Sequence, residues 1–184
     1  MMGEFVMWFE LASLFDYTVK YTAALKAYFI VFKDQPSNNL FIEAAEEVLC
    51  RQIYSELFKI YDRASTRSNV NCSINQLAKV CKESSAFSDE EKKELSEKID
   101  KLNASCDALL PKELRNKKIA HYDLESICKK YDDIAIDDIE KLVKNTASFL
   151  EEVSSKLCFA DAKIYNFEEL VVDYQKSILE LKQG

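Results

Sequence analysis

The sequence predicts an all-α fold of about seven helices, built as a single domain over residues 1–184. Two glycines and two prolines are too few for the many turns of a β-fold, whereas helices use such residues mainly at their ends. Hydrophobic residues at 48% and charged residues at 31% are typical of a soluble globular chain. Apolar residues recur every three or four positions along most of the chain, which is the spacing of an amphipathic helix.

Helices are expected wherever this spacing persists between polar breaks. In chain order the expected segments are 5–32, a helix from Leu40 that ends before the break at 63–72, one after Ser73, 88–110, a short helix from Pro111, about 138–157 and about 167–181. Three of these starts show capping-box spacing, in which an N-cap side chain and a residue three positions later satisfy each other's free amides. The pairs are Ser73 with Gln76, Ser88 with Glu91 and Asn166 with Glu169, and Asp137 with Glu140 is a close variant.

The same spacing predicts which side chains face the core. In the helix after Asn39, the expected inward residues are Leu40, Ala44, Val48, Ile53, Leu57 and Ile60. In the segment 88–110 they are Leu95, Ile99, Leu102, Cys106 and Leu109. In the last helix they are Phe167, Leu170, Val171, Tyr174, Ile178 and Leu181.

The spacing of the cysteines and the first residues of the chain indicate in which compartment the protein is expected. The six cysteines form no C-x-x-C pair and no zinc spacing, so we expect reduced thiols, no metal site and no cofactor. The apolar beginning of the chain carries Glu4 and Glu10 and lacks a basic start, so it is a poor signal peptide and too polar to span a bilayer. We therefore expect a cytoplasmic protein without a membrane partner.

Basic residues gather in one part of this acidic chain. The net charge is -7, yet residues 111–130 contain six Lys or Arg against three acidic residues, and they include His121, the only histidine. One interpretation is a solvated helix whose cations favour its C-terminal dipole. The other is a phosphate site arranged around the only side chain that titrates near neutral pH.

The spacing of Arg115 and His121 indicates how such a site would be assembled. The two residues are six positions apart, hence about 240° around a helix and ~9 Å along it. They do not stack on one another within one regular helix. Two copies of the motif that face each other across a twofold axis would bring these groups together, so the spacing favours a homodimer.

The longer pattern in 111–123, R-N-K-x-x-A-H-x-D over Arg115–Asp123, resembles the R-x(4–6)-H signature of the HEPN superfamily. Its flanks, including the stretch 57–80, look like the abortive-infection branch of that superfamily. The resemblance implies a homodimeric helical bundle, often a metal-independent endoribonuclease in toxin or phage-defence systems, with an antitoxin protein as a possible partner. The family's arginine, polar neighbour and histidine correspond to Arg115, Asn116 and His121. Some relatives have a tyrosine two residues after the histidine, where this chain has Asp123, preceded by Tyr122.

The chemistry of these residue types suits RNA cleavage. RNA provides its own nucleophile, the 2′-OH, which DNA lacks, so RNA and not DNA is the expected substrate. A neutral His121 is a suitable base near pH 7, and the planar guanidinium of Arg115 matches phosphate oxygens. The expected backbone contacts are Lys112, Lys117 and Lys118, and the expected supporting residues are Tyr122, Asp123 and Asp62. For Asp62, the alternative is that it caps or ion-pairs the end of its own helix.

Two other functions are compatible with the sequence. The first is a non-catalytic HEPN-like protein that binds nucleotide or RNA at the same residues. The second is a helical interaction adaptor in which His121 is a structural residue.

Overall fold

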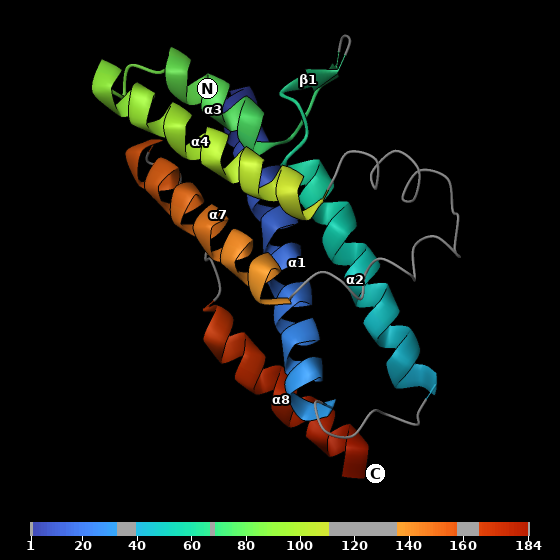
Figure 1. Ribbon diagram of the computed structural model, residues 1–184. Helices are drawn as coiled ribbons and strands as arrows, with labels where there is room; N and C mark the ends of the chain where they lie inside the picture. Colours follow the sequence, from blue (N-terminus) through green and yellow to red (C-terminus); the bar gives the residue numbers. More distant parts are fainter. Residues whose placement is uncertain (1, 33–39, 67–68, 111–135, 158–165, 184) are drawn as a thin grey trace.

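The computed structural model describes residues 2–32, 40–66, 69–110, 136–157 and 166–183, and it confirms the all-α class (Figure 1). Six helices lie in these described parts: α1 (Met2–Phe32), α2 (Leu40–Ile60), α3 (Ile74–Glu83), α4 (Asp89–Leu109), α7 (Ile136–Leu157) and α8 (Phe167–Gln183). A hairpin of two very short strands, β1 (Ser65–Thr66) and β2 (Asn69–Val70), separates α2 from α3. The short helix expected from Pro111 lies outside the described residues.

The long helix α1 is the centre of the bundle, with α2, α7 and α8 packed against it (Figure 1). Contacts between side chains of different helices establish the relative directions of these helices. Lys26 in α1 pairs with Glu140 near the start of α7, and Lys182 at the end of α8 lies over the ring of Phe32 at the end of α1. Helix α8 therefore runs parallel to α1. Helix α4 packs on α7 in an antiparallel manner, because Glu91 pairs with Lys156 and Lys98 with Glu152.

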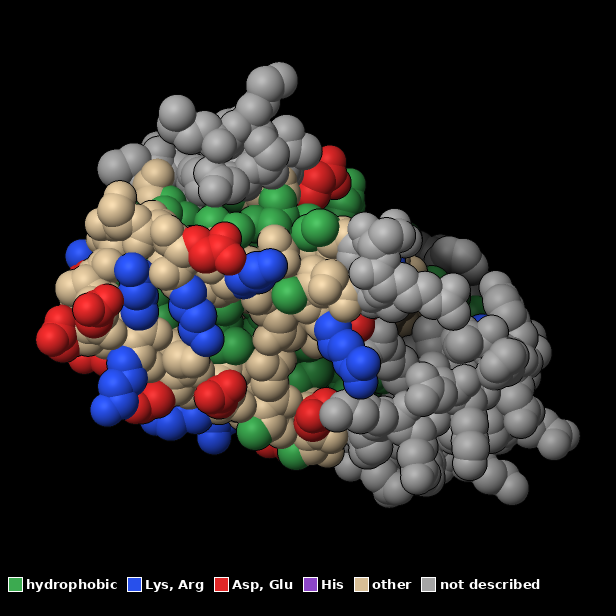
Figure 2. Space-filling model, turned by 90° about the horizontal axis from the view of Figure 1, so that it is seen from above, with side chains coloured by type: hydrophobic (Ala, Val, Ile, Leu, Met, Phe, Trp, Pro, Cys, Tyr) green, Lys and Arg blue, Asp and Glu red, His purple; other side chains and the backbone are tan. Residues whose placement is uncertain are grey.

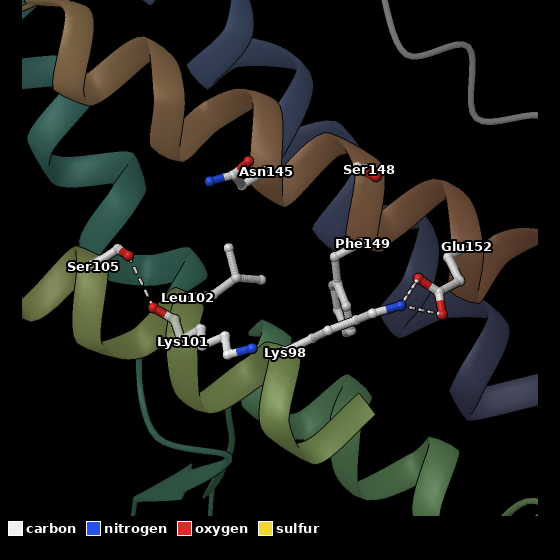
Figure 3. A pocket seen from close by; sticks show the side chains of 8 residues that line it. All are labelled: Lys98, Lys101, Leu102, Ser105, Asn145, Ser148, Phe149 and Glu152. Carbon is white, nitrogen blue, oxygen red and sulfur yellow. Dashed lines mark hydrogen bonds and ion pairs between the residues drawn. The ribbon is translucent and has the colours of Figure 1, made fainter. Parts of the chain in front are cut away.

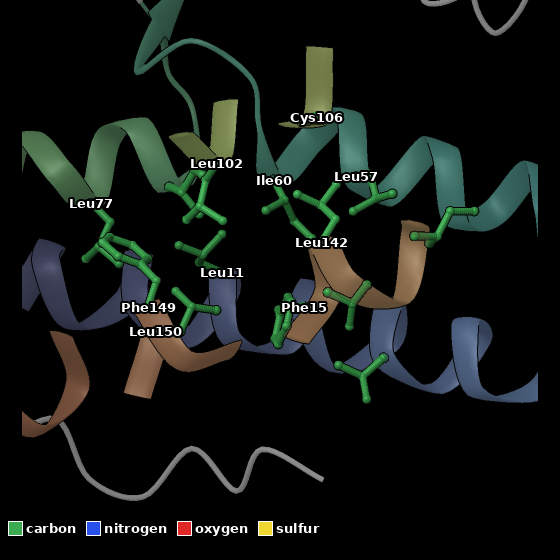
Figure 4. Packing of buried hydrophobic residues seen from close by; sticks show 14 of the residues in the cluster. Leu11, Phe15, Leu57, Ile60, Leu77, Leu102, Cys106, Leu142, Phe149 and Leu150 are labelled. Carbon is green, nitrogen blue, oxygen red and sulfur yellow. The ribbon is translucent and has the colours of Figure 1, made fainter. Parts of the chain in front are cut away.

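Apolar side chains from these helices form one continuous core (Figure 4). Leu11 and Phe15 of α1 lie across from Leu57 and Ile60 of α2, and residues of α3, α4 and α7 complete the same core. The predicted α4 residues Leu95, Ile99, Leu102 and Cys106 are each at most 6% exposed, so the three-and-four spacing identified this face correctly. Removing this much apolar surface from water is the main stabilising contribution to the fold.

Two threonines lie inside the core in the middle of α1. Thr18 and Thr22 are 0% exposed, and an unpaired hydroxyl at such a depth would be costly. Their hydroxyls donate to backbone carbonyls one turn earlier, Thr18 Oγ1 to Leu14 O at 3.1 Å and Thr22 Oγ1 to Thr18 O at 2.8 Å. These local bonds allow α1 to contact its neighbours on several sides without unsatisfied polar groups at these positions.

The capping residues behave largely as expected. Ser88 and Glu91 form a complete capping box, with Glu91 N donating to Ser88 Oγ at 3.2 Å and Ser88 N donating to Glu91 Oε2 at 2.8 Å. Ser73 accepts from Gln76 N, and Asn166 caps α8 through Glu168 N. The expectation for Asp137 was wrong. Helix α7 already begins at Ile136, so Asp137 lies in its first turn, and its carboxylate is engaged by Lys26.

Some expected core residues lie on the surface. Ala44 and Val48 in α2 are both exposed, Val48 at 63%. The step of five from Val48 to Ile53 rotates the apolar stripe by about 140°, so the two halves of α2 cannot face one core. Leu181 at the end of α8 is 73% exposed. In that last turn it is Lys182 that reaches α1, with Nζ 5.2 Å from the centroid of the Phe32 ring.

Candidate functional site

Most of the residues predicted for the site belong to one segment of the chain. This segment joins the end of α4 to the start of α7, and residues 111–135 lie outside the part that the structure describes. The predicted site residues within it are Lys112, Arg115, Asn116, Lys117, Lys118, His121, Tyr122 and Asp123. The elements on both sides of this segment are described, and they show how its two ends are held.

The first anchor is the end of α4. Leu110, the last described residue before the segment, is 1% exposed, and its amide donates to Cys106 O at 2.7 Å. Two turns before Leu110, Asn103 exchanges side-chain hydrogen bonds with Asn75 of α3. The shorter of them is 2.8 Å, from Asn103 Nδ2 to Asn75 Oδ1. Asn75 Nδ2 also lies 2.9 Å from the carbonyl oxygen of Asp62. The departure point of the segment is thus tied to α3 and to the end of α2.

Asp62 is the one predicted site residue that the structure describes. Its carboxylate accepts from the amide of Arg63 at 2.9 Å and from Asn71 Nδ2 at 3.2 Å, so it spans the base of the β1–β2 hairpin. Asn71 Nδ2 also donates to Arg63 O at 2.8 Å. This geometry supports the structural interpretation, in which Asp62 organises the end of its own helix.

The second anchor is the beginning of α7. Glu140 pairs with Lys26 of α1 and with Lys144, while Lys144 also pairs with Glu168 of α8. Burial acts to raise the pKa of Glu140, but its hydrogen bonds with Lys144 and Lys26 lower that pKa below its ordinary value. The hydrogen bond with Glu140 raises the pKa of Lys26. These ion pairs hold the start of α7 against both α1 and α8.

A pair of hydrogen-bonded hydroxyl groups joins the end of α2 to α7. The hydroxyl groups of Tyr61, just after α2, and Thr146 in α7 are hydrogen-bonded, and Thr146 also donates to Leu142 O at 2.7 Å. Burial raises the pKa of Tyr61, and the hydrogen bond with Thr146 lowers it only in part. The tyrosine therefore stays neutral well above physiological pH.

A surface groove lies between α4 and α7 (Figure 3). It has a volume of about 260 Å³, and its floor is made by Leu102 and Phe149, which are 6% and 3% exposed. Its remaining lining is polar: Lys98, Lys101, Ser105, Asn145, Ser148 and Glu152. Lys98 Nζ reaches across to Glu152 at 2.6 and 2.8 Å and bridges the groove. Sequence reasoning missed this groove, although Asn145, Ser148 and Glu152 recur at the i, i+3, i+7 spacing of one helical face.

Other kinds of site receive no support from the described residues. Nowhere among them do three or more His, Cys, Asp or Glu side chains gather in a way that could hold a metal ion. The four described cysteines, Cys50, Cys72, Cys81 and Cys106, form no disulfide with one another, and burial raises the pKa of Cys81 to about 12. No helix in the described parts combines the length and the apolar character that crossing a membrane requires.

The fold and its anchors define a class of protein, an all-α bundle in which a basic, histidine-bearing segment joins two antiparallel helices of the core. Within that class, the chain belongs to the AbiU2 family of HEPN proteins, HEPN_AbiU2, which matches residues 13–174. No curated protein and no solved structure shows a match to the chain. The match covers every described helix except the two ends of the chain, and it includes the whole of the segment 111–135. The expected relation to abortive-infection HEPN domains is confirmed.

Proposed function

We propose that this protein is a metal-independent endoribonuclease that acts as an abortive-infection effector. The observation that carries the proposal is the sequence Arg115-Asn116-Lys117-Lys118 followed by His121, which lies inside the region that matches the AbiU2 family. This stretch unites a proton-transfer group with several cations in an otherwise acidic chain. A toxin of this kind would be held inactive by an antitoxin protein until infection.

The reaction follows from the chemistry of these groups. Neutral His121 accepts the proton of the ribose 2′-OH, whose oxygen then forms a bond to the adjacent phosphorus. The bond from phosphorus to the 5′-oxygen breaks, and this oxygen takes a proton from the partner's His121 in its protonated form. Arg115 binds the phosphate oxygens as their charge increases, and Asn116 hydrogen-bonds the phosphate or orients the imidazole. The products are a 2′,3′-cyclic phosphate and a 5′-OH.

The described structure supports this proposal through the anchors of the segment. The hydrogen bonds of Asn75 and Asn103 hold one end, and the ion pairs of Lys26, Glu140 and Lys144 hold the other. A rigid support of this kind favours catalysis, because catalytic groups need to be positioned within a fraction of an ångström. A homodimer would then supply the second histidine.

The decisive experiment compares wild-type protein with His121→Ala on a mixture of cellular RNA in the presence of EDTA. We expect the wild type to cut RNA and to leave cyclic phosphate ends, and the variant to lose about 10²–10⁴-fold in rate with little change in melting temperature. Replacing the 2′-OH at the cut nucleotide by hydrogen abolishes cutting there. A deoxy substrate that is cut equally well would contradict the mechanism.

Arg115→Lys is the matched control for this experiment. Lysine keeps the charge but loses the planar fork, so we expect it to impair turnover more than RNA binding. Binding of RNA without any cleavage by the wild type would favour the non-catalytic alternative. An early-melting His121→Ala variant that still cuts RNA would show that His121 is structural, as the adaptor alternative requires.

A further inference from the structure

The charge of the side chains changes along the length of the groove between α4 and α7. Its α7 side carries Asn145, Ser148 and Glu152. Lys141 continues the same helical stripe one turn before Asn145. Its α4 side carries Lys98, Lys101 and Ser105. Glu152, the acidic member, lies at the far end and is engaged by Lys98, so the positive charge of Lys101 and Lys141 lies toward the opposite end.

The described residues on either side of the segment 111–135, Leu110 and Ile136, lie toward that opposite end. Helices α4 and α7 are antiparallel, so the end of α4 and the start of α7 point toward the same end of the groove. Ser105 is four residues before the end of α4, which corresponds to ~6 Å along the helix axis. The end of the groove nearer to Lys141 is therefore the end nearer to the two described residues, Leu110 and Ile136, that flank the segment with Arg115 and His121.

The polar groups of the groove are available for a ligand. Among the described residues, no hydrogen bond or ion pair engages the side chains of Lys101, Lys141, Asn145 or Ser148. The face seen in Figure 2 intersperses basic side chains with acidic ones. Two unengaged cations beside amide and hydroxyl groups, above an apolar floor, are suited to a phosphate backbone with its sugars.

We propose that the α4/α7 groove binds the backbone of a single-stranded RNA. Lys101 and Lys141 contact phosphates, while Asn145 and Ser148 hydrogen-bond phosphate oxygens or ribose hydroxyls. The Ser105 hydroxyl donates to Lys101 O at 2.9 Å, so it accepts from a ribose hydroxyl. Lys98 is held by Glu152 and marks the far end of the path. The inference rests on the proposed endoribonuclease function, and it extends that function to residues outside the motif. It predicts that the substrate is a flexible strand, because a groove of about 260 Å³ is too small for a duplex.

The test is the salt dependence of RNA binding. The probe is a fluorescein-labelled single-stranded 2′-O-methyl oligonucleotide, which lacks the attacking hydroxyl and remains intact. Each phosphate that a lysine neutralises adds about 0.7 to the slope of log affinity against log salt concentration for a single strand. We therefore expect Lys101→Ala combined with Lys141→Ala to weaken binding and to reduce this slope by about 1.4.

The matched control removes two other exposed lysines, Lys79 in α3 and Lys93 in α4, neither of which lines the groove. It changes the net charge by the same amount, and we expect a much smaller change in slope. A second variant, Ser148→Trp, fills the groove without a change in charge and should weaken binding. Its control is Ser177→Trp on α8, which should bind like the wild type.

The outcomes separate this inference from the proposed function. If the wild type cuts RNA in EDTA but the Lys101/Lys141 double variant keeps the wild-type slope, the groove does not bind RNA and the nuclease proposal stands. Equal loss of slope in the Lys79/Lys93 control, or wild-type binding by Ser148→Trp, would also overturn the groove assignment. If the wild type neither cuts RNA nor binds the oligonucleotide, both proposals are wrong.

Discussion

At the scale of single residues, we expect the hydrogen bond between the hydroxyl groups of Tyr61 and Thr146 to contribute to the stability of the fold. Thr146→Val keeps the volume but leaves the Tyr61 hydroxyl without this partner. We expect this change to lower the free energy of unfolding by about 1–3 kcal/mol, as measured by urea denaturation near pH 7. Tyr61→Phe removes the other partner and should cost less, about 1 kcal/mol, because Thr146 still donates to Leu142 O.

The double variant provides the control for this pair. Because each single change removes the same hydrogen bond, their combined cost should be smaller than the sum of the separate costs by at least about 0.5 kcal/mol. Strict additivity would show that the two hydroxyls do not interact energetically.

The ionisation of the same tyrosine predicts a dependence on pH. Burial raises the pKa of Tyr61 above its ordinary value of 10.0. The neutral, folded form is therefore favoured, and this contribution to stability is fully present below the unfolded pKa and is lost as pH rises through the folded pKa. We expect wild-type stability to fall at pH values above about 10 more steeply than that of Tyr61→Phe. If the stability of the wild type and of Tyr61→Phe fell in parallel as the pH rises, this would contradict a raised pKa of Tyr61 in the folded protein.

At the scale of elements, the start of α7 is held by ion pairs that no local pattern specifies. Glu140 is 14% exposed and pairs with both Lys26 and Lys144. Glu140→Gln should lower the free energy of unfolding by about 1–2 kcal/mol near neutral pH, because Lys26 and Lys144 each lose one of their two carboxylate partners. Since the pKa of Glu140 is lowered in the fold, its contribution is present above the unfolded pKa and disappears as pH falls through the folded pKa.

The measurement is thermal denaturation of both proteins from neutral to acidic pH, where the two melting temperatures should converge. Glu168→Gln is the matched control, because its side chain is 67% exposed and it reaches only Lys144. We expect its effect to stay within about 0.5 kcal/mol. A larger effect for Glu168→Gln than for Glu140→Gln would show that α8 rather than α1 positions the start of α7.

At the scale of the whole molecule, the proposed mechanism requires two chains. The sequence contains a single histidine, whereas the reaction uses one base and one acid. Several apolar side chains of α1 and α8 are also exposed, including Phe9 at 65% and Leu179 at 45%. Burial of such surface in a twofold interface is favourable. We expect light scattering at micromolar concentration to give the mass of a dimer, and a monomer mass would exclude a site shared between subunits.

Much of the local structure could be predicted from the sequence. The capping box of Ser88 and Glu91, the buried positions Leu95 and Ile99, and the all-α class depend on interactions within three or four residues, so their signal lies in local spacing. The HEPN relation rested on Arg115, Asn116 and His121, which lie close together in the chain. The predictions failed where burial depends on distant partners, as for Val48 and Leu181.

The sequence by itself determined the six described helices, most of their caps and the family, because these follow from residues that are neighbours along the chain. Only the tertiary structure decided which side chains far apart in the chain contact one another. Lys26 and Glu140 are 114 residues apart, Tyr61 and Thr146 are 85 apart, and the groove joins α4 to α7. The physical reason is that these contacts arise when apolar faces of separate helices pack together, and the polar groups at the edges of that packing then find partners that no local pattern specifies.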